Sequence, residues 1–259
     1  MLTYSLTQMF EQANQYLLPL FRIAALLMIV PVLGARVVPQ RLRIGIALIL
    51  TLIITPLLPP QGVANLSTAN LVSAIAEQIL IGLLMGFAFK LVFSAIETGG
   101  HLIGQTMGLG FAQMVDPNNG ITIPVVSQFY TLLATLIFLL LNGHLLLIST
   151  LVESFQVLPV LEFRAQGDSV WMLLSSALWI FKGGVLMALP VMTALLLVNI
   201  AFGVVMRSAP QLNIFVIGFP ISLLLGFILI LWTLPGYLTQ FSQMLDQSFS
   251  LVMSMLRGV

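Results

Sequence analysis

The 259-residue chain contains no cysteine and only two histidines, and charged residues make up just 7% of it. Without cysteine there are no disulfide bonds, no thiol catalysis and no cysteine-ligated metal sites. His101 and His144 are too few for a multi-histidine metal centre. The net charge of +1 argues against nucleic acid as a partner. Several large classes of metalloprotein, redox protein and nucleic-acid-binding protein are therefore excluded or disfavoured.

Enzyme signatures are also missing. Residues 108–113 begin like a dinucleotide fingerprint, but they lack its third glycine and the preceding strand. The chain has no P-loop, no His-Glu-x-x-His and no Gly-x-Ser-x-Gly. His101 and Asp116 could form an acid–base pair, but no nucleophile or metal set accompanies them. The sequence therefore predicts a protein that is not an enzyme and that uses no cofactor and no metal.

The chain is rich in apolar residues: 59% of its residues are hydrophobic, and its mean hydropathy is +1.12. Because soluble domains are about 25% charged, this composition indicates an integral membrane protein. Its fold class is all-α, with six apolar helices and both ends outside. Amphipathic helices are expected before residue 17 and from Tyr237 onward. Arg36, Arg41 and Arg43 place the first link on the cytoplasmic side. The six segments cover about residues 17–34, 42–58, 71–96, 124–152, 170–206 and 214–234.

The apolar segments carry charges and prolines that lipid tolerates poorly. Such residues are expected where protein rather than lipid surrounds them. For Glu77, Lys90 and Lys182, a structural ion pair or snorkelling is the simpler interpretation, and an ion or proton pathway is the alternative. All four buried charges are expected to find partners within an assembly of subunits. Gly82 and Gly86 form a small-xxx-small pair, which predicts close helix packing. The charges are Arg22, Glu77, Lys90 and Lys182, and the prolines are Pro19, Pro31, Pro190 and Pro220.

Residues 97–123 contain six glycines interleaved with apolar side chains and end in the turn-forming run Asp116–Gly120. Glycine at this density weakens a helix, so a flexible apolar loop packed inside other structure is expected. Met107, Phe111 and Met114 fit two interpretations equally well, ordinary core packing and a deformable seal.

Two long motifs resemble a known family. Residues 107–120 read MGLGFAQMVDPNNG, and residues 188–203 read ALPVMTALLLVNIAFG, continuing at 207–220 with RSAPQLNIFVIGFP. Together with the order of apolar segments, they resemble the FliR/SctT family, the R subunits of type III export gates. Within that resemblance, residues 1–170 are similar to the P subunit of the gate. Residues 171–259 are similar to its two-helix Q subunit.

The resemblance implies a structural and gating subunit of the flagellar type III export gate. Kinked helical hairpins would pack with P and Q subunits in a helical hetero-oligomer, and a B-type switch subunit would associate with it. The channel would pass unfolded flagellar proteins across the bacterial inner membrane at the flagellar basal body. The family's channel plug maps onto Met107, Gly108, Leu109, Gly110, Phe111, Ala112, Gln113, Met114, Val115, Asp116 and Pro117.

Two rival classes are a secondary transporter and an intramembrane enzyme. A small proton-coupled transporter would use Glu77, Lys90 and Lys182 for coupling. Such transporters often contain internal repeats with matched broken segments, and the two halves of this chain show no convincing repeat. The missing signatures disfavour the enzyme.

Overall fold

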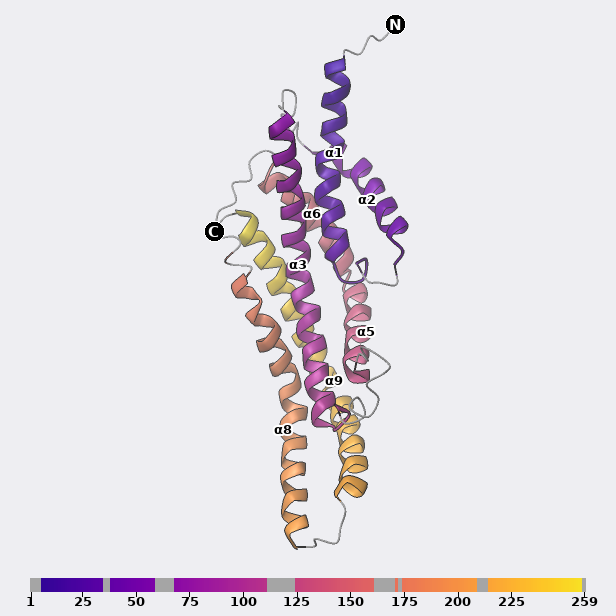
Figure 1. Cartoon of the computed structure of the whole chain (residues 1–259), viewed down its shortest axis with the longest axis vertical. Coiled ribbons are helices and arrows are strands. Elements are labelled where there is room, and N and C mark those ends of the chain that lie inside the picture. Colours follow the sequence, from indigo (N-terminus) through magenta and orange to yellow (C-terminus); the bar gives the residue numbers. More distant parts are fainter. Residues whose placement is uncertain are drawn as a thin grey trace. The chain divides into compact units, whose positions relative to one another are not determined.

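The computed structural model describes residues 6–34, 38–58, 68–110, 124–160, 171, 174–208 and 214–257. All regular structure in these ranges is helical, which confirms the all-α class. Figure 1 shows the helices in chain order. They are α1 (Leu6–Ile29), α2 (Gln40–Ile54), the 3-10 turn η1 (Thr55–Leu57), α3 (Thr68–Thr106), α5 (Val125–Leu140), α6 (Gly143–Val157), α8 (Leu178–Ser208) and α9 (Ile214–Arg257).

Several helices are longer than the hydropathy pattern predicts. The amphipathic lead-in and the first apolar segment form one helix, α1, and the last apolar segment continues through the tail as α9. The fifth segment is a single helix, as expected, although Pro190 lies inside it. The fourth is interrupted where Asn142-Gly143-His144 predicts a break, and α5 and α6 meet there at 67°.

Within the described ranges, four helices are long and apolar enough to cross a membrane. There are five if the bent pair α5–α6 counts as one span, where the sequence predicts six. The segment that does not qualify is α1. Its first half carries Glu11, Gln12, Asn14 and Gln15, and its second half carries Arg22, which together lower its hydropathy. The other four are Gln40–Leu57, Asn70–Thr106, Leu174–Arg207 and Gly218–Arg257.

The expected loop over residues 97–123 is wrong in its first part, because α3 continues to Thr106. The glycines there serve helix contacts that larger residues would prevent. A Cβ added to Gly99 would lie 2.9 Å from the carbonyl oxygen of Gly184 in α8. A Cβ on Gly100 would lie 2.6 Å from the Cα of Ser127 in α5. Close backbone packing therefore outweighs the low helix propensity of glycine.

The described chain divides into two compact units. The first comprises residues 1–90, 138–176 and 247–259, and the second comprises residues 91–137 and 177–246. In the first unit, Phe89 packs edge-on against Phe249 with ring centroids 4.7 Å apart. In the second unit, Tyr237 donates a hydrogen bond of 3.1 Å to the carbonyl oxygen of Tyr130. Each unit has its own apolar core.

In the first unit, α1 and α3 approach closely at the predicted small-xxx-small pair. A Cβ on Gly82 would meet the carbonyl oxygen of Arg22 and would lie 2.9 Å from the Cβ of Ala25. One turn later, a Cβ on Gly86 would lie 3.0 Å from the Cβ of Ile29. These glycines hold the two helices near enough for the side chain of Arg22 to reach Gln78 on α3.

Candidate functional site

The end of α3 is where the proposed plug segment begins. Gly108 has a φ of +85°, the left-handed conformation that glycine adopts most readily. The N–H of Leu109 donates to the carbonyl oxygen of Gly104, and the N–H of Gly108 donates to that of Gln105, both at 3.0 Å. This pair of bonds is a Schellman motif, which ends a helix in a fixed geometry. The predicted plug segment therefore starts from a helix cap of defined geometry.

Met107 lies at this cap and is fully buried. Its side chain packs over Gly226 of α9, where an added Cβ would lie 2.6 Å from Cγ and 2.9 Å from Sδ of Met107. A Cβ added to Gly108 would lie 3.1 Å from the ring of Phe219 on the same helix. In this chain Met107 is a packing residue that ties the cap to α9.

Phe111–Pro117, which complete the plug segment, lie outside the described residues, as does the predicted turn Asp116–Gly120. Of the eleven predicted plug residues, the structure describes Met107, Gly108, Leu109 and Gly110. Met107 is buried, and the other three are half-buried.

The contact between Met107 and Gly226 can be tested by enlarging the glycine and shortening the methionine. Gly226→Leu is expected to destabilise the folded chain by about 1–3 kcal/mol, because the new side chain needs the space that Met107 fills. Met107→Ala in the same chain should restore part of that loss, giving a coupling of about 0.5–3 kcal/mol in a double-mutant cycle. Thermal unfolding of the full-length chain in detergent measures it, and strictly additive effects would show that the two residues do not share this space.

The second predicted feature is the buried charge of Arg22, which the structure places wholly inside the first unit. Its Nε donates to Oε1 of Gln78 at 2.8 Å, and its Nη1 donates to the carbonyl oxygen and Oγ of Ser154 at 2.9 and 3.2 Å. Its Nη2 donates to the carbonyl oxygen of Leu158 at 2.9 Å, and its guanidinium lies 4.2 Å from the ring centroid of Phe155. Arg22 thus finds its partners in its own chain.

The partners of Arg22 are neutral, and most of them belong to the end of α6. The carbonyl group of Leu158 lies at the cap of α6, where carbonyl oxygens lack helical donors. The carbonyl oxygen of Ser154, one turn earlier, accepts from Arg22 in addition to the backbone N–H of Leu158. The negative end of the helix dipole favours a cation at this place. Gln78 is held in turn by its own bond of 3.0 Å to the carbonyl oxygen of Val160. The arginine joins α1, α3 and α6 without a carboxylate.

The other predicted charges are placed differently. Glu77 is half-buried, and Lys90 and Lys182 are exposed. Glu77 and Lys90 are thirteen residues apart on α3, about 20 Å along the helix. None of the three has an ion-pair partner among the described residues. Arg257 and Glu153 form an ion pair there, with side chains exposed and an N–O distance of 3.8 Å. No group of three or more His, Asp or Glu side chains that could hold a metal ion occurs in the described ranges.

The sequence reasoning missed the residues that hold Arg22, namely Gln78, Ser154 and Phe155. One signal was present, since Gln78 is a polar amide in the middle of an apolar segment. Backbone carbonyl partners leave no mark in a sequence. The pairs Gly99–Gly184 and Met107–Gly226 were missed for a similar reason, because each joins segments far apart in the chain.

Comparison with known proteins identifies the family. The family model described as "Bacterial export proteins, family 1" matches residues 13–248. The flagellar biosynthetic protein FliR of Escherichia coli K12 is 41% identical over 235 residues, which cover 91% of this chain and 90% of that protein. The protein of the same name from Pectobacterium carotovorum is 40% identical over 235 residues, with the same coverage.

A more distant relative matches even more of the length. The flagellar biosynthetic protein FliR of Buchnera aphidicola, from Acyrthosiphon pisum, is 30% identical over 246 residues, 95% of each chain. The relatives are thus named for flagellar biosynthesis, and the family description names export. The resemblance seen in the two sequence motifs thus extends over nearly the whole chain, which belongs to the bacterial export protein family 1.

Proposed function

We propose that this component of the flagellar export apparatus is a channel-forming and gating subunit of the type III export gate. It assembles with P and Q subunits and a B-type switch subunit at the basal body in the bacterial inner membrane. Unfolded flagellar proteins are the cargo. The single observation that supports this role most strongly is the match to proteins named FliR over nine-tenths of the chain. The division into a P-like part, residues 1–170, and a Q-like part, residues 171–259, belongs to the same proposal.

The exposed apolar surface of α8 and α9 supports assembly with sister subunits. Only 22% of the most apolar window of each helix is buried, against 61% for α3. α8 also exposes Lys182, which has no ion-pair partner among the described residues. A charge and a proline in such a helix are best accommodated where other protein covers it. Sister subunits packed along α8 and α9 provide that cover.

The rigid start of the plug segment supports a gating role. Met107 and the cap at Gly108 fix one end of the segment to packed helices. Residues 111–117, with Phe111, Met114 and Val115, follow this fixed point in the sequence. An apolar constriction can exclude ions by dewetting, and it can move aside for a polypeptide. The plug closes the resting channel in this way.

Deleting residues 111–117 tests the gate while leaving Met107 and its cap in place. Reconstituted export complexes with the deletion are expected to conduct small ions in planar bilayers, because the apolar barrier is gone. Complexes with the native chain and bilayers without protein set the two baselines. Deleting residues 107–117 should leak as well, with a lower yield of complex because the anchor is lost. Ion conductance equal to that of native complexes in both deletions would exclude the plug.

The comparisons give no support to the alternative of a small proton-coupled transporter. Glu77 and Lys90 lie about 20 Å apart along α3, too far for direct proton exchange between them. The relatives from Escherichia coli, Pectobacterium carotovorum and Buchnera aphidicola all carry the name of a flagellar biosynthetic protein.

A further inference from the structure

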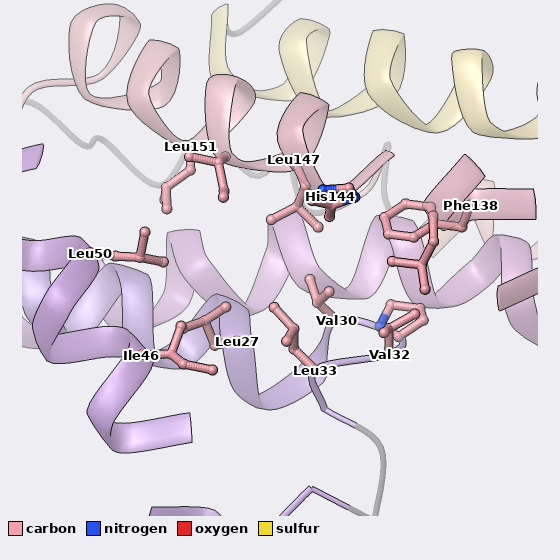
Figure 2. A pocket seen from close by; sticks show the side chains of 13 residues that line it. Leu27, Val30, Val32, Leu33, Ile46, Leu50, Phe138, His144, Leu147 and Leu151 are labelled. Atoms are coloured by element: carbon pink, nitrogen blue, oxygen red, sulfur yellow. The ribbon is translucent and has the colours of Figure 1, made fainter. Parts of the chain in front are cut away.

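An apolar cavity of about 250 Å³ lies within the first unit, beside the break between α5 and α6. Its walls come from the end of α1 and the turn after it, from α2, and from α5 and α6 (Figure 2). Every lining residue is apolar except His144. A smaller engineered cavity of about 150 Å³, lined by similar side chains, stays dry and binds apolar molecules. Water is therefore a poor occupant, and an apolar group is a good one.

The backbone beside the cavity is held in an unusual conformation. Val32 lines the cavity with a φ of +75°, and Asn142, two residues before His144, has a φ of +55°. They are the two non-glycine residues with positive φ in the described chain. A β-branched residue such as Val32 rarely adopts this region. Strained residues of this kind cluster at ligand sites and switch regions.

One polar atom sits among these apolar walls. Nδ1 of His144 is buried and has no hydrogen-bond partner among the described residues. In Figure 2 the imidazole lies beside Leu147, across the pocket from Val32. An apolar side chain of another protein would leave this nitrogen unsatisfied. An ester carbonyl oxygen accepts a hydrogen bond from it in the Nδ1-protonated tautomer.

A basic residue, Arg43, lies on α2 close to the residues that line the cavity. Ile46 and Leu50 of α2 line the cavity, and Arg43 precedes them by three and seven residues. At 100° per residue, Arg43 lies within about 60° of both on the helix surface. Arg41 is exposed and lies about 140–180° away from them. Positive charge and apolar cavity therefore share one face of α2.

The rest of α2 is an apolar surface open to its surroundings. This helix belongs to a segment that is long and apolar enough to cross a membrane, and only 22% of that segment is buried. Hydrocarbon chains of a bilayer can therefore contact the exposed side of α2, next to the half-buried Ile46 and Leu50 that line the cavity. The exposed side chains are Leu42, Ile44, Leu48, Ile49, Leu52 and Ile53.

We infer that the cavity binds one acyl chain of an anionic phospholipid, whose phosphate pairs with Arg43. The apolar walls take the hydrocarbon, His144 meets the ester group, and the guanidinium meets the phosphate. Such a lipid fills space between α1, α2 and α6 that no side chain fills. This inference does not depend on the gating role proposed above.

Native mass spectrometry of the full-length chain in detergent tests the inference. The chain is titrated with dioleoyl phosphatidylglycerol, with dioleoyl phosphatidylcholine, and with glycerol phosphate as the headgroup alone. Phosphatidylglycerol is expected to bind about fivefold more tightly than phosphatidylcholine, the ratio that one basic residue near an anionic lipid supplies. Glycerol phosphate should not bind. Equal binding of the two lipids, or binding of glycerol phosphate as strong as that of phosphatidylglycerol, would overturn the inference.

Matched variants separate the cavity from the rest of α2. Arg43→Gln should abolish the preference for the anionic lipid, while Arg41→Gln keeps most of it because Arg41 lies on the opposite face. Ile46→Trp should weaken binding of both lipids at least tenfold by filling the cavity, and Leu48→Trp on the far face should not. Unfolding temperatures show which variants fold. If Ile46→Trp does not fold, Arg43→Gln still tests the site, because it leaves the cavity intact. Equal effects within either pair would contradict the site.

Native mass spectrometry of the chain co-purified with its export-apparatus partners shows what occupies the cavity in the assembly. Retention of one phosphatidylglycerol molecule per chain, lost in Arg43→Gln, supports the lipid. Loss of the lipid on assembly would mean that a partner side chain fills the cavity, and the inference would be wrong.

Discussion

Replacing Arg22 with leucine is expected to destabilise the folded chain by about 2–5 kcal/mol, because it removes the donor of a buried hydrogen-bond network and leaves neutral acceptors unpaired. Arg22 is fully buried and donates four hydrogen bonds to Gln78, Ser154 and Leu158. Leucine leaves the buried Oε1 of Gln78 and the half-buried carbonyl oxygen of Leu158 without the donors that Arg22 supplies, and an unsatisfied buried group costs about 1–3 kcal/mol. The contact with the ring of Phe155 is lost as well.

This loss is large compared with the total stability of a protein domain, about 5–15 kcal/mol. The amount of chain in the membrane, measured by immunoblotting, should therefore fall severalfold, and swimming motility should fall with it. Arg22→Lys should give an intermediate level, because an ammonium keeps the charge near the end of α6 but cannot reach all four acceptors. Arg41→Leu removes an exposed arginine and is the matched control. Native levels and native motility for Arg22→Leu would show that the buried network contributes little.

Replacing Gly184 with leucine is expected to be nearly as damaging. A Cβ at this position would lie 2.8 Å from the carbonyl oxygen of Ala95 and 3.1 Å from both the N of Gly99 and the Cβ of Thr98. Two of these three atoms belong to the backbone of α3, so α3 and α8 must separate to admit a side chain. Overpacking of this kind costs about 1–3 kcal/mol and occasionally more. The separation also disturbs the part of α3 that leads to the cap at Gly108.

A second glycine on the same helix provides the matched control. Gly203 of α8 is exposed, and a Cβ added to it would have no atom within 4 Å. Gly184→Ala should lower the unfolding temperature of the detergent-solubilised chain. Gly203→Ala should raise it, because alanine favours the helix by about 1 kcal/mol over glycine. If both substitutions shift the unfolding temperature in the same direction and by the same amount, helix propensity alone explains them, and the close approach of α3 and α8 is not important.

Much of the helical layout can be predicted because apolar burial and turn chemistry act over short windows of sequence. Five of the six expected apolar segments correspond to described helices, or to the bent pair α5–α6, that can span a membrane by length and composition. The break that Asn142-Gly143 predicts occurs at that place. The exception is α1. The polar residues in its first half lower the mean hydropathy of the helix, although its second half is apolar.

The glycine-rich stretch shows where short windows mislead. Gly99 and Gly100 lower helix propensity locally, which favours a loop. In the structure both glycines lie in α3, because Gly184 and Ser127 come within van der Waals contact of their backbones. The end of the helix falls at Gly108 instead, where the left-handed conformation permits a Schellman motif.

By itself, the sequence determined that the chain is an all-α membrane protein without cysteine chemistry, and its two motifs pointed to the family that the comparisons identify. Only the tertiary structure decided that Arg22 is held by Gln78, 56 residues away, and by Ser154, 132 residues away. It also decided that Met107 is an anchor over Gly226. The physical reason is that hydrophobicity adds up along neighbouring residues. Hydrogen-bond acceptors and close packing come instead from whichever distant segments fold against a residue.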